Sequence, residues 1–346
     1  MNAEVSRAKN IVETYDGPPL RIMEVCGTHT HEIFRYGIRR ILPPAVKLIS
    51  GPGCPVCVTP TGYIDEAVML ALAHGAVICT FGDLVRVPGT EKSLADARSE
   101  GAQVQTVYSP LDAVAYAAKH QDEQVVFLSV GFETTTPASC LAVKEARGQG
   151  LKNFTLLTAN KTMDNAYYLL KGSTDAFLFP GHVSAITGAK IYEKLKNDGI
   201  CGTVTGFTAG EILAALAVNI KKIQEGKPFF VNCYPRVVSE EGSPAARKLM
   251  AETLEPCDAE WRGLGCIKGS GLKLNERYAE FDARLKFALP ALVGRSNPVC
   301  RCGDVLRGVC RPDECKAFGK ACVPEHPVGA CMVSSEGACA AWYKYG

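Results

Sequence analysis

The sequence contains no apolar run long enough to cross a membrane, and residues 1–25 contain none long enough for the core of a signal peptide. Charged residues are spread throughout that first segment. We therefore expect no membrane insertion and no export to an oxidising space, and we predict a cytoplasmic protein. Cysteines in that compartment stay reduced, and clustered reduced cysteines usually bind metal.

A strong charge of one sign is also missing. The chain has 38 lysines and arginines against 36 acidic residues, a formal net charge of +2 at pH 7, and its basic residues form no blocks. Because nucleic-acid binding depends on cations that neutralise phosphates, we predict no nucleic-acid partner. The length of 346 residues and the hydrophobic content of 47% are typical of a globular protein with two or three domains. A small ligand or a specific protein partner is the better expectation.

Cysteine, in contrast, is abundant. The chain has 16 cysteines, and seven of them fall between Cys300 and Cys339. This tail lacks the paired C-x-x-C units of zinc ribbons and knuckles. An iron–sulfur cluster accepts wider spacing, because each corner iron takes one thiolate. Zinc is the alternative that composition leaves open, and Cys300, Cys302 and Cys310 are additional thiols nearby. The best set of four cluster ligands is Cys315, Cys322, Cys331 and Cys339.

Short apolar runs alternate with helical patterns along most of the chain. Continuous apolar strands without strict alternation suit sheets that are covered on both faces, so we predict an α/β fold with parallel sheets and right-handed crossovers. The expected helices are 64–74, 111–120, 163–171, 186–197 and 211–224. The expected strands form two series, 21–25, 46–50, 76–80 and 104–108, followed by 125–130, 154–158, 176–179 and 202–205.

The two series of strands resemble copies of one unit, which predicts two Rossmann-like domains related by internal duplication. Three turns match in the same order: VCGTHTH (25–31) with VGFETTTP (130–137), LISGPGCPVC (48–57) with LFPGHVSAI (178–186), and TFGDL (80–84) with TGFTAGEIL (205–213). Ligands of such sheets bind at the carboxyl ends of the strands. We predict one α/β domain over 20–122, a second over 123–240, and a mainly helical or loop iron–sulfur domain over 241–346 with 1–19.

A C-x-x-C pair, Cys54 and Cys57, follows the second expected strand. Its spacing allows a reversible disulfide, and a helix that begins there would lower the pKa of the first thiol. The surrounding glycines and prolines of GPGCPVCVTP predict a rigid turn that presents a reactive pair. The alternative is half of a zinc site, completed by Cys26 and His29.

Cys26 lies in a turn with His29 and His31. A thiolate beside an imidazole is the usual arrangement for an activated thiol or for a transition-metal site. Each histidine alone has a structural alternative, because imidazole can satisfy backbone groups in a turn. The isolated cysteines are interpreted as small core residues: Cys79, Cys140, Cys201, Cys233, Cys257 and Cys266.

Together these motifs resemble the HypD family of hydrogenase maturation factors. The segments that carry the resemblance are RIMEVCGTHTH (21–31), GPGCPVCVTP (51–60), FGDLVRVPG (81–89), SVGFETTTP (129–137), FPGHVS (179–184), GFTAGEIL (206–213), GSGLKLNERYAEFDA (269–283), CRCGDVLRG (300–308) and CMVSSEGACAAWY (331–343). They extend over nearly the whole chain and occur in the family's order. The resemblance implies two Rossmann-like α/β domains and a third domain that holds a 4Fe–4S cluster.

The resemblance also implies a function, the assembly of the Fe(CN)2CO unit of nickel–iron hydrogenases. It implies a complex with a HypC-type chaperone and cyanide delivered by a HypE-type protein. Cys26 would bind the transient iron that carries CN and CO, opposite the amino-terminal cysteine of HypC, with His29 beside it. Cys54 and Cys57 would be a redox dithiol that exchanges electrons with the cluster. The alternatives are a freestanding iron–sulfur thiol-disulfide oxidoreductase and a structural zinc protein.

Overall fold

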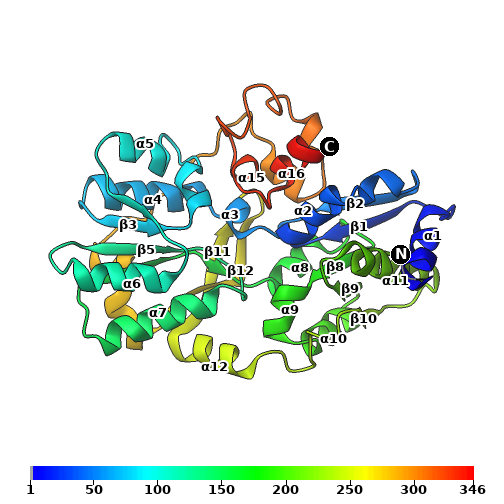
Figure 1. The fold of residues 1–346 in the computed structure, drawn as a ribbon, viewed down its shortest axis with the longest axis horizontal. Helices are drawn as coiled ribbons and strands as arrows, with labels where there is room; N and C mark the ends of the chain where they lie inside the picture. Colours follow the sequence, from blue (N-terminus) through cyan, green and yellow to red (C-terminus); the bar gives the residue numbers. More distant parts are fainter. Residues whose placement is uncertain (1–2) are drawn as a thin grey trace.

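The computed structural model describes residues 3–346 and contains two parallel β-sheets (Figure 1). Sheet A has the order β10-β9-β8-β1-β2, and sheet B has the order β4-β3-β5-β6. All eight predicted strands are present, so the predicted α/β class with Rossmann-like parallel sheets is confirmed. The strands of the two sheets are β1 (Leu20–Glu24), β2 (Val46–Ser50), β8 (Ala176–Pro180), β9 (Gly202–Thr205) and β10 (Phe230–Asn232), and β3 (Val77–Thr80), β4 (Val104–Thr106), β5 (Val125–Ser129) and β6 (Phe154–Thr158).

Helices cover both faces of the sheets, which explains their continuous apolar strands. In β5, Val126 and Leu128 pack into one core cluster, whereas Val125 and Phe127 pack into another on the opposite face. Around sheet B lie α4 (Thr61–Leu72) and α5 (Leu94–Ser99) on one side, and α6 (Pro110–Lys119) and α7 (Thr136–Gly148) on the other (Figure 1). The part around sheet A contains α1 (Ala3–Glu13), α2 (Gly27–Arg35), α8 (Asp164–Leu170), α9 (Gly181–Thr187), α10 (Lys190–Asn197) and α11 (Ala209–Gln224).

The remaining strands form a third, three-stranded sheet of order β11-β12-β7. A long antiparallel hairpin, β11 (Leu254–Trp261) and β12 (Gly265–Leu274), follows α12 (Pro244–Thr253) and pairs with β7 (Asn160–Lys161). The cysteine-rich tail lies between the two α/β parts (Figure 1), where α15 contacts α3 and α16 contacts α2. The short helices are α3 (Pro55–Val58), α13 (Ala283–Lys286), α14 (Cys302–Leu306), α15 (Ala330–Val333) and α16 (Ala338–Tyr345), with 3-10 turns at Ile38–Ile41, Gly82–Arg86, Glu276–Phe281 and Pro312–Glu314.

The strands of sheet A come from two separate parts of the chain, and the predicted boundary between residues 122 and 123 falls inside sheet B, so it does not separate the two sheets. The chain leaves sheet A after β2, builds all of sheet B, and returns to sheet A at β8, because β1 pairs with both β2 and β8. The grouping of residues 1–19 with the tail is also wrong. Ala8 and Val12 of α1 pack against Leu216 and Ile220 of α11, in the core beside sheet A.

The two sheets nevertheless have the same arrangement of strands. Sheet A contains the run β9-β8-β1-β2, and sheet B is β4-β3-β5-β6, so β1 corresponds to β5. The matched turns VCGTHTH and VGFETTTP follow these two strands and are therefore equivalent. The other two matches join positions that are not equivalent. One pairs the turn after β2 with the turn after β8, and the other pairs the turn after β3 with the turn after β9. The internal duplication stays a prediction. It is supported by the first matched pair of turns and by the common order of the strands.

The tip of the β11–β12 hairpin is held between α3 and α14. The backbone N–H of Arg262 donates to the Val58 carbonyl at 2.8 Å. Gly263 has a φ of +78°, and a Cβ placed on it would lie 2.2 Å from the Cα of Gly303. Two backbones therefore touch at a position that also requires the left-handed conformation, and only glycine satisfies both requirements.

This contact predicts different effects for two glycines of the same turn. Gly265 has a φ of +81°, but a Cβ on it would meet no atom within 4 Å. Gly265→Ala should therefore lower the free energy of unfolding by only about 1–2 kcal/mol of backbone strain. Gly263→Ala should cost roughly 1–3 kcal/mol more, because it also overpacks the contact with Gly303. Urea unfolding of both variants checks this, and equal losses would show that the hairpin tip does not contact α14 as described.

Candidate metal and thiol site

Cys26 and the Cys54–Cys57 turn meet at the carboxyl edge of sheet A. They follow β1 and β2, which are parallel neighbours and therefore end on the same side. The Gly27 N–H donates to the Gly53 carbonyl at 3.0 Å, and a Cβ on Gly53 would lie 2.0 Å from the Cys26 nitrogen. The two cysteine turns are thus in direct backbone contact, at the edge where ligands of parallel sheets bind.

The Cys26 thiol is uncharged in this environment. Cys26 is only 8% exposed, and this burial raises the pKa of its thiol to about 12. Hydrogen bonds from backbone amides of α2 lower this pKa, but by less than burial raises it. The nearby carboxylate of Glu336 raises this pKa further. A thiolate at Cys26 consequently requires a compensating cation, and a bound metal ion is the group that commonly displaces a thiol proton in proteins.

His29 is buried, neutral and fixed in one tautomer. Burial lowers the pKa of His29 to about 4. Its Nε2 lies 2.9 Å from the Gly206 carbonyl, which can only accept, so Nε2 carries the proton. Nδ1 has no hydrogen-bond partner among the described residues. The ring stacks on Phe207 at 4.7 Å between centroids, and His182 stacks on Phe207 at 4.0 Å.

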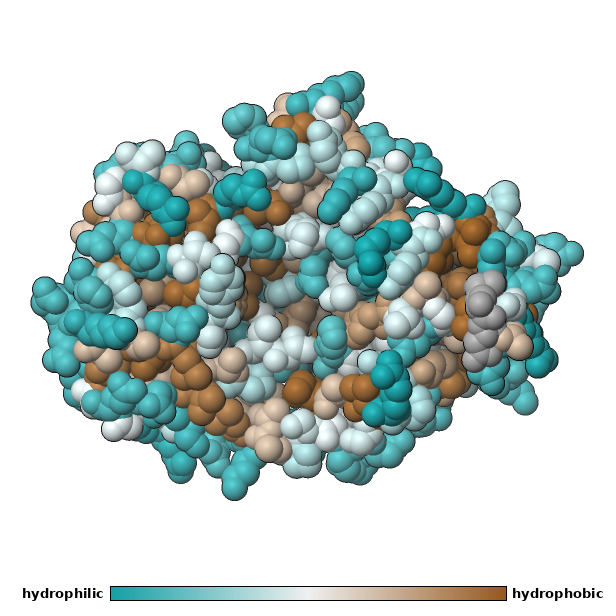
Figure 2. All heavy atoms as spheres, in the orientation of Figure 1, coloured by the Kyte–Doolittle hydropathy of each residue, from teal (hydrophilic) through white to brown (hydrophobic). Residues whose placement is uncertain are grey.

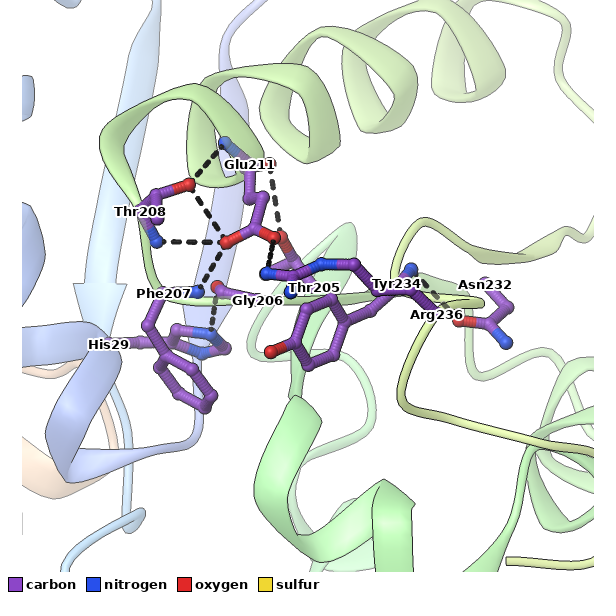
Figure 3. A network of polar contacts seen from close by, with 9 residues as sticks. All are labelled: His29, Thr205, Gly206, Phe207, Thr208, Glu211, Asn232, Tyr234 and Arg236. Atoms are coloured by element: carbon purple, nitrogen blue, oxygen red, sulfur yellow. Dashed lines mark hydrogen bonds and ion pairs between the residues drawn. The ribbon is translucent and has the colours of Figure 1, made fainter.

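The turn that binds His29 is held by Glu211 (Figure 3). The Glu211 carboxylate accepts hydrogen bonds from the backbone N–H groups of Phe207 at 3.1 Å and Thr208 at 3.0 Å. Arg236 pairs with the other oxygen at 2.6 Å. The T-x-x-E spacing of a capping box, Thr208 and Glu211, was the sequence signal for this network. It was missed because the partner of the turn, His29, lies far away in the sequence.

A segment of the tail covers the Cys26 turn. Glu336 accepts a hydrogen bond from the Thr28 hydroxyl at 2.7 Å, and a Cβ on Gly27 would lie 2.5 Å from the Glu336 side chain. His31, which the sequence grouped with Cys26, has its ring 3.3 Å from the Ser335 carbonyl and 5.5 Å from the Tyr345 ring. Glu336 was not among the predicted site residues. It lies in the SSEG segment of a family motif, but no local pattern predicted a role for it.

The Cys54–Cys57 pair is close but buried. Cys54 precedes α3, its sulfur accepts from the Cys57 N–H at 3.4 Å, and the two residues are 3% and 0% exposed. The predicted presentation of this pair at the surface is therefore wrong, because the tail packs over α3. Contact with Cys331 lowers the pKa of Cys57, but contact with Cys54 and burial outweigh it and raise that pKa well above its ordinary value.

The tail cysteines surround a small apolar cavity. Its sulfur atoms come from Cys300, Cys302, Cys315, Cys322 and Cys339. Three of the four predicted cluster ligands thus line it. The fourth, Cys331, is fully buried and packs in the same core cluster as Cys57, Cys302 and Cys339. The predicted dithiol and the tail cysteines therefore form one continuous set of contacts, which spacing alone did not reveal.

The donor set of this cavity fits an iron–sulfur cluster. Within residues 3–346, no three His, Cys, Asp or Glu side chains are arranged around a point that would hold a single ion. A cluster instead needs separate thiolates around a cavity, and the ionisable side chains of this lining are five cysteines and Arg301, with no carboxylate.

The isolated cysteines only partly match their prediction as core residues. Cys79 and Cys140 are fully buried, but Cys266 is exposed and Cys201, Cys233 and Cys257 are partly exposed.

Among residues 3–346, no helix is long and apolar enough to cross a membrane. Hydrophilic residues dominate the outer edge of the face in Figure 2.

Comparison with known proteins gives one consistent result. The family model described as "HypD: Hydrogenase formation hypA family" matches residues 3–346. The chain is 43% identical to the hydrogenase maturation factor HypD of Azotobacter vinelandii over 338 residues, which cover 94% of the chain and 89% of that protein. It is 42% identical to HypD of Escherichia coli over 335 residues, with the same coverage. Identity to HypD of Rhodobacter capsulatus is 40% over 359 residues, covering 99% of the chain and 94% of that protein.

Proposed function

The chain belongs to the HypD family of hydrogenase maturation factors and has a role in hydrogenase maturation. On this premise we propose that it is the scaffold and redox factor on which the Fe(CN)2CO unit of nickel–iron hydrogenases is assembled. The observation that carries the proposal is the continuity of the sulfur sites. The Cys26 turn touches the Cys54 turn, and α3, which carries Cys57, packs against α15, which carries Cys331 of the tail.

In this proposal Cys26 binds the iron that is being modified. Iron would replace the thiol proton, which the high pKa of Cys26 otherwise retains. A soft thiolate suits an iron that carries strong-field diatomic ligands. The neutral His29 beside this site keeps an unprotonated Nδ1, so it adds no positive charge next to the iron.

The partners supply what the chain lacks at this site. Cys26 alone cannot complete the coordination of an iron atom, so a HypC-type chaperone would contribute a second thiolate from its amino-terminal cysteine. A HypE-type protein would deliver cyanide. The complex would form in the cytoplasm, where these thiols stay reduced.

The tail and the dithiol would supply electrons. We propose Cys315, Cys322, Cys331 and Cys339 as the ligands of a 4Fe–4S cluster, which when bound supplies electrons one at a time. Cys54 and Cys57 can give or take two electrons as they close or open a disulfide. The packing of Cys331 and Cys57 in one core cluster, through the contact of α15 with α3, links the two sites. The burial of Cys54 and Cys57 disfavours the alternative of a freestanding oxidoreductase, whose dithiol must reach an external disulfide.

Replacing Cys26 tests the iron site. Cys26→Ala should keep the fold and the brown colour of the tail cluster, which uses other cysteines, but should abolish the CN and CO infrared bands of the complex with the chaperone. Cys266→Ser is the matched control, because Cys266 is exposed and remote in sequence from every site residue. Infrared spectroscopy of both complexes decides the matter, and normal bands in Cys26→Ala would remove this residue from the mechanism.

The cluster ligands are tested by single replacements in the tail. Cys315→Ala, Cys322→Ala, Cys331→Ala and Cys339→Ala should each lose the brown chromophore and become sensitive to protease after about Leu289, because the metal holds this segment together. Cys300→Ala should keep both properties. Cys302→Ala discriminates further, since Cys302 lines the cavity and Cys331 lies beside it. Loss of iron and sulfide in Cys302→Ala but not in Cys331→Ala would remove Cys331 from the ligand set. One equivalent of zinc in the anaerobic wild type would contradict the cluster altogether.

A further inference from the structure

Arg262 is a buried cation without an acidic partner. The residue is 7% exposed, and its side chain donates to the carbonyls of Thr59 at 2.7 Å and Pro88 at 3.4 Å. In the part of the chain that the structure describes, it forms no ion pair with Asp or Glu. Burial lowers the pKa of Arg262, and the groups that act in the opposite direction are sulfur atoms, those of Cys302, Cys331, Cys300 and Cys57.

Two other partly buried arginines show how this fold normally matches such a charge. Arg39 pairs at 2.8 Å with Glu24, whose side chain is fully buried. Arg284 pairs at 2.7 Å with Glu66, whose side chain is 10% exposed. An interior charge without a counter-charge is strongly destabilising, and arginine does not escape by losing its proton. Arg262, in contrast, has backbone carbonyls and no carboxylate as its hydrogen-bond partners, so a counter-charge would come from another group.

The position of Arg262 identifies that group. It begins the hairpin turn that is held between α3, which carries Cys57, and α14, which begins at Cys302. Its side chain binds the carbonyl at the end of α3, and its charge acts on cysteines of both the dithiol and the tail. Neutral thiols give no counter-charge, whereas cysteines that ligate metal are thiolates.

We propose that Arg262 is the counter-cation of the sulfur centre formed by the tail cysteines and Cys57, and that it raises the reduction potential of the cluster held there. This inference rests on the cluster of the proposed function. Arg262 is not a ligand, because a guanidinium has no free lone pair. Reduction adds one electron, and so one negative charge, to the cluster, and a fixed positive charge nearby stabilises the reduced form more than the oxidised form.

The test compares the charge with the hydrogen bonds of this side chain. Arg262→Gln keeps a donor but loses the charge, and Arg262→Lys keeps the charge. Arg284→Gln is the matched control, since it also removes a partly buried arginine, one whose charge is already balanced by Glu66. The full-length proteins are purified anaerobically, analysed for iron and sulfide, and titrated with dithionite under electron paramagnetic resonance.

At the wild-type midpoint potential, Arg262→Gln should show at least a tenfold lower ratio of reduced to oxidised cluster, which for a one-electron couple is a shift of about 59 mV. Arg262→Lys and Arg284→Gln should stay near the wild-type ratio. A second outcome would also support the proposal. In it, the uncharged variants Arg262→Gln and Arg262→Met both lose the cluster. Arg262→Lys and Arg284→Gln retain it, because the centre requires the positive charge.

Two results would overturn the inference. One is a cluster of unchanged potential in Arg262→Gln, and the other is loss of the cluster from all three Arg262 variants, Arg262→Lys included, which would indicate a purely structural role. Both leave the proposed function intact. Absence of iron and sulfide from the wild type would instead refute the cluster of the proposed function itself.

Discussion

The pairing of β1 between β2 and β8 is the constraint on which the site depends. Because all three strands are parallel, the turns that follow them meet at one edge, and this is where Cys26 contacts the turn of Cys54. The next strand, β9, ends beside them and presents the Gly206 carbonyl to His29. No single turn makes this site, and His29 and Gly206 lie 177 residues apart in the sequence.

The tail turns this edge into an enclosed site. It places Glu336 over Cys26 and Cys331 against Cys57. Burial raises the pKa of the Cys26 thiol, and contact with Cys54 together with burial raises the pKa of Cys57, so the site as a whole favours neutral thiols until a cation is bound. Arg262 is already positioned beside the tail cysteines. Under the proposed function, thiols that become charged only when a metal is present would suit the uptake and release of that metal.

Local patterns were sufficient to predict the eight strands and the motif turns, because apolar runs and glycine-rich turns are encoded within a few residues. The interleaving of the sheets was not predictable in this way, since β1 pairs with β8 across more than 150 residues. The same holds for single residues of the site. Glu336 lies in a motif without any local chemical signal, and Arg262 lies outside every motif. Cys302 was indistinguishable from Cys300 until the fold brought it into one core cluster with Cys331.

The central claim is that the dithiol and the tail cysteines exchange electrons through direct contact. The most direct measurement is a redox titration of the anaerobic wild type, with free thiols alkylated at each potential and the state of Cys54 and Cys57 determined by mass spectrometry. The account predicts a reversible two-electron, two-proton transition between a Cys54–Cys57 disulfide and two thiols. The cluster would pass the two electrons one at a time, and the reductant of the titration would reduce it again between the transfers. A pair that stays as free thiols at every potential would contradict it.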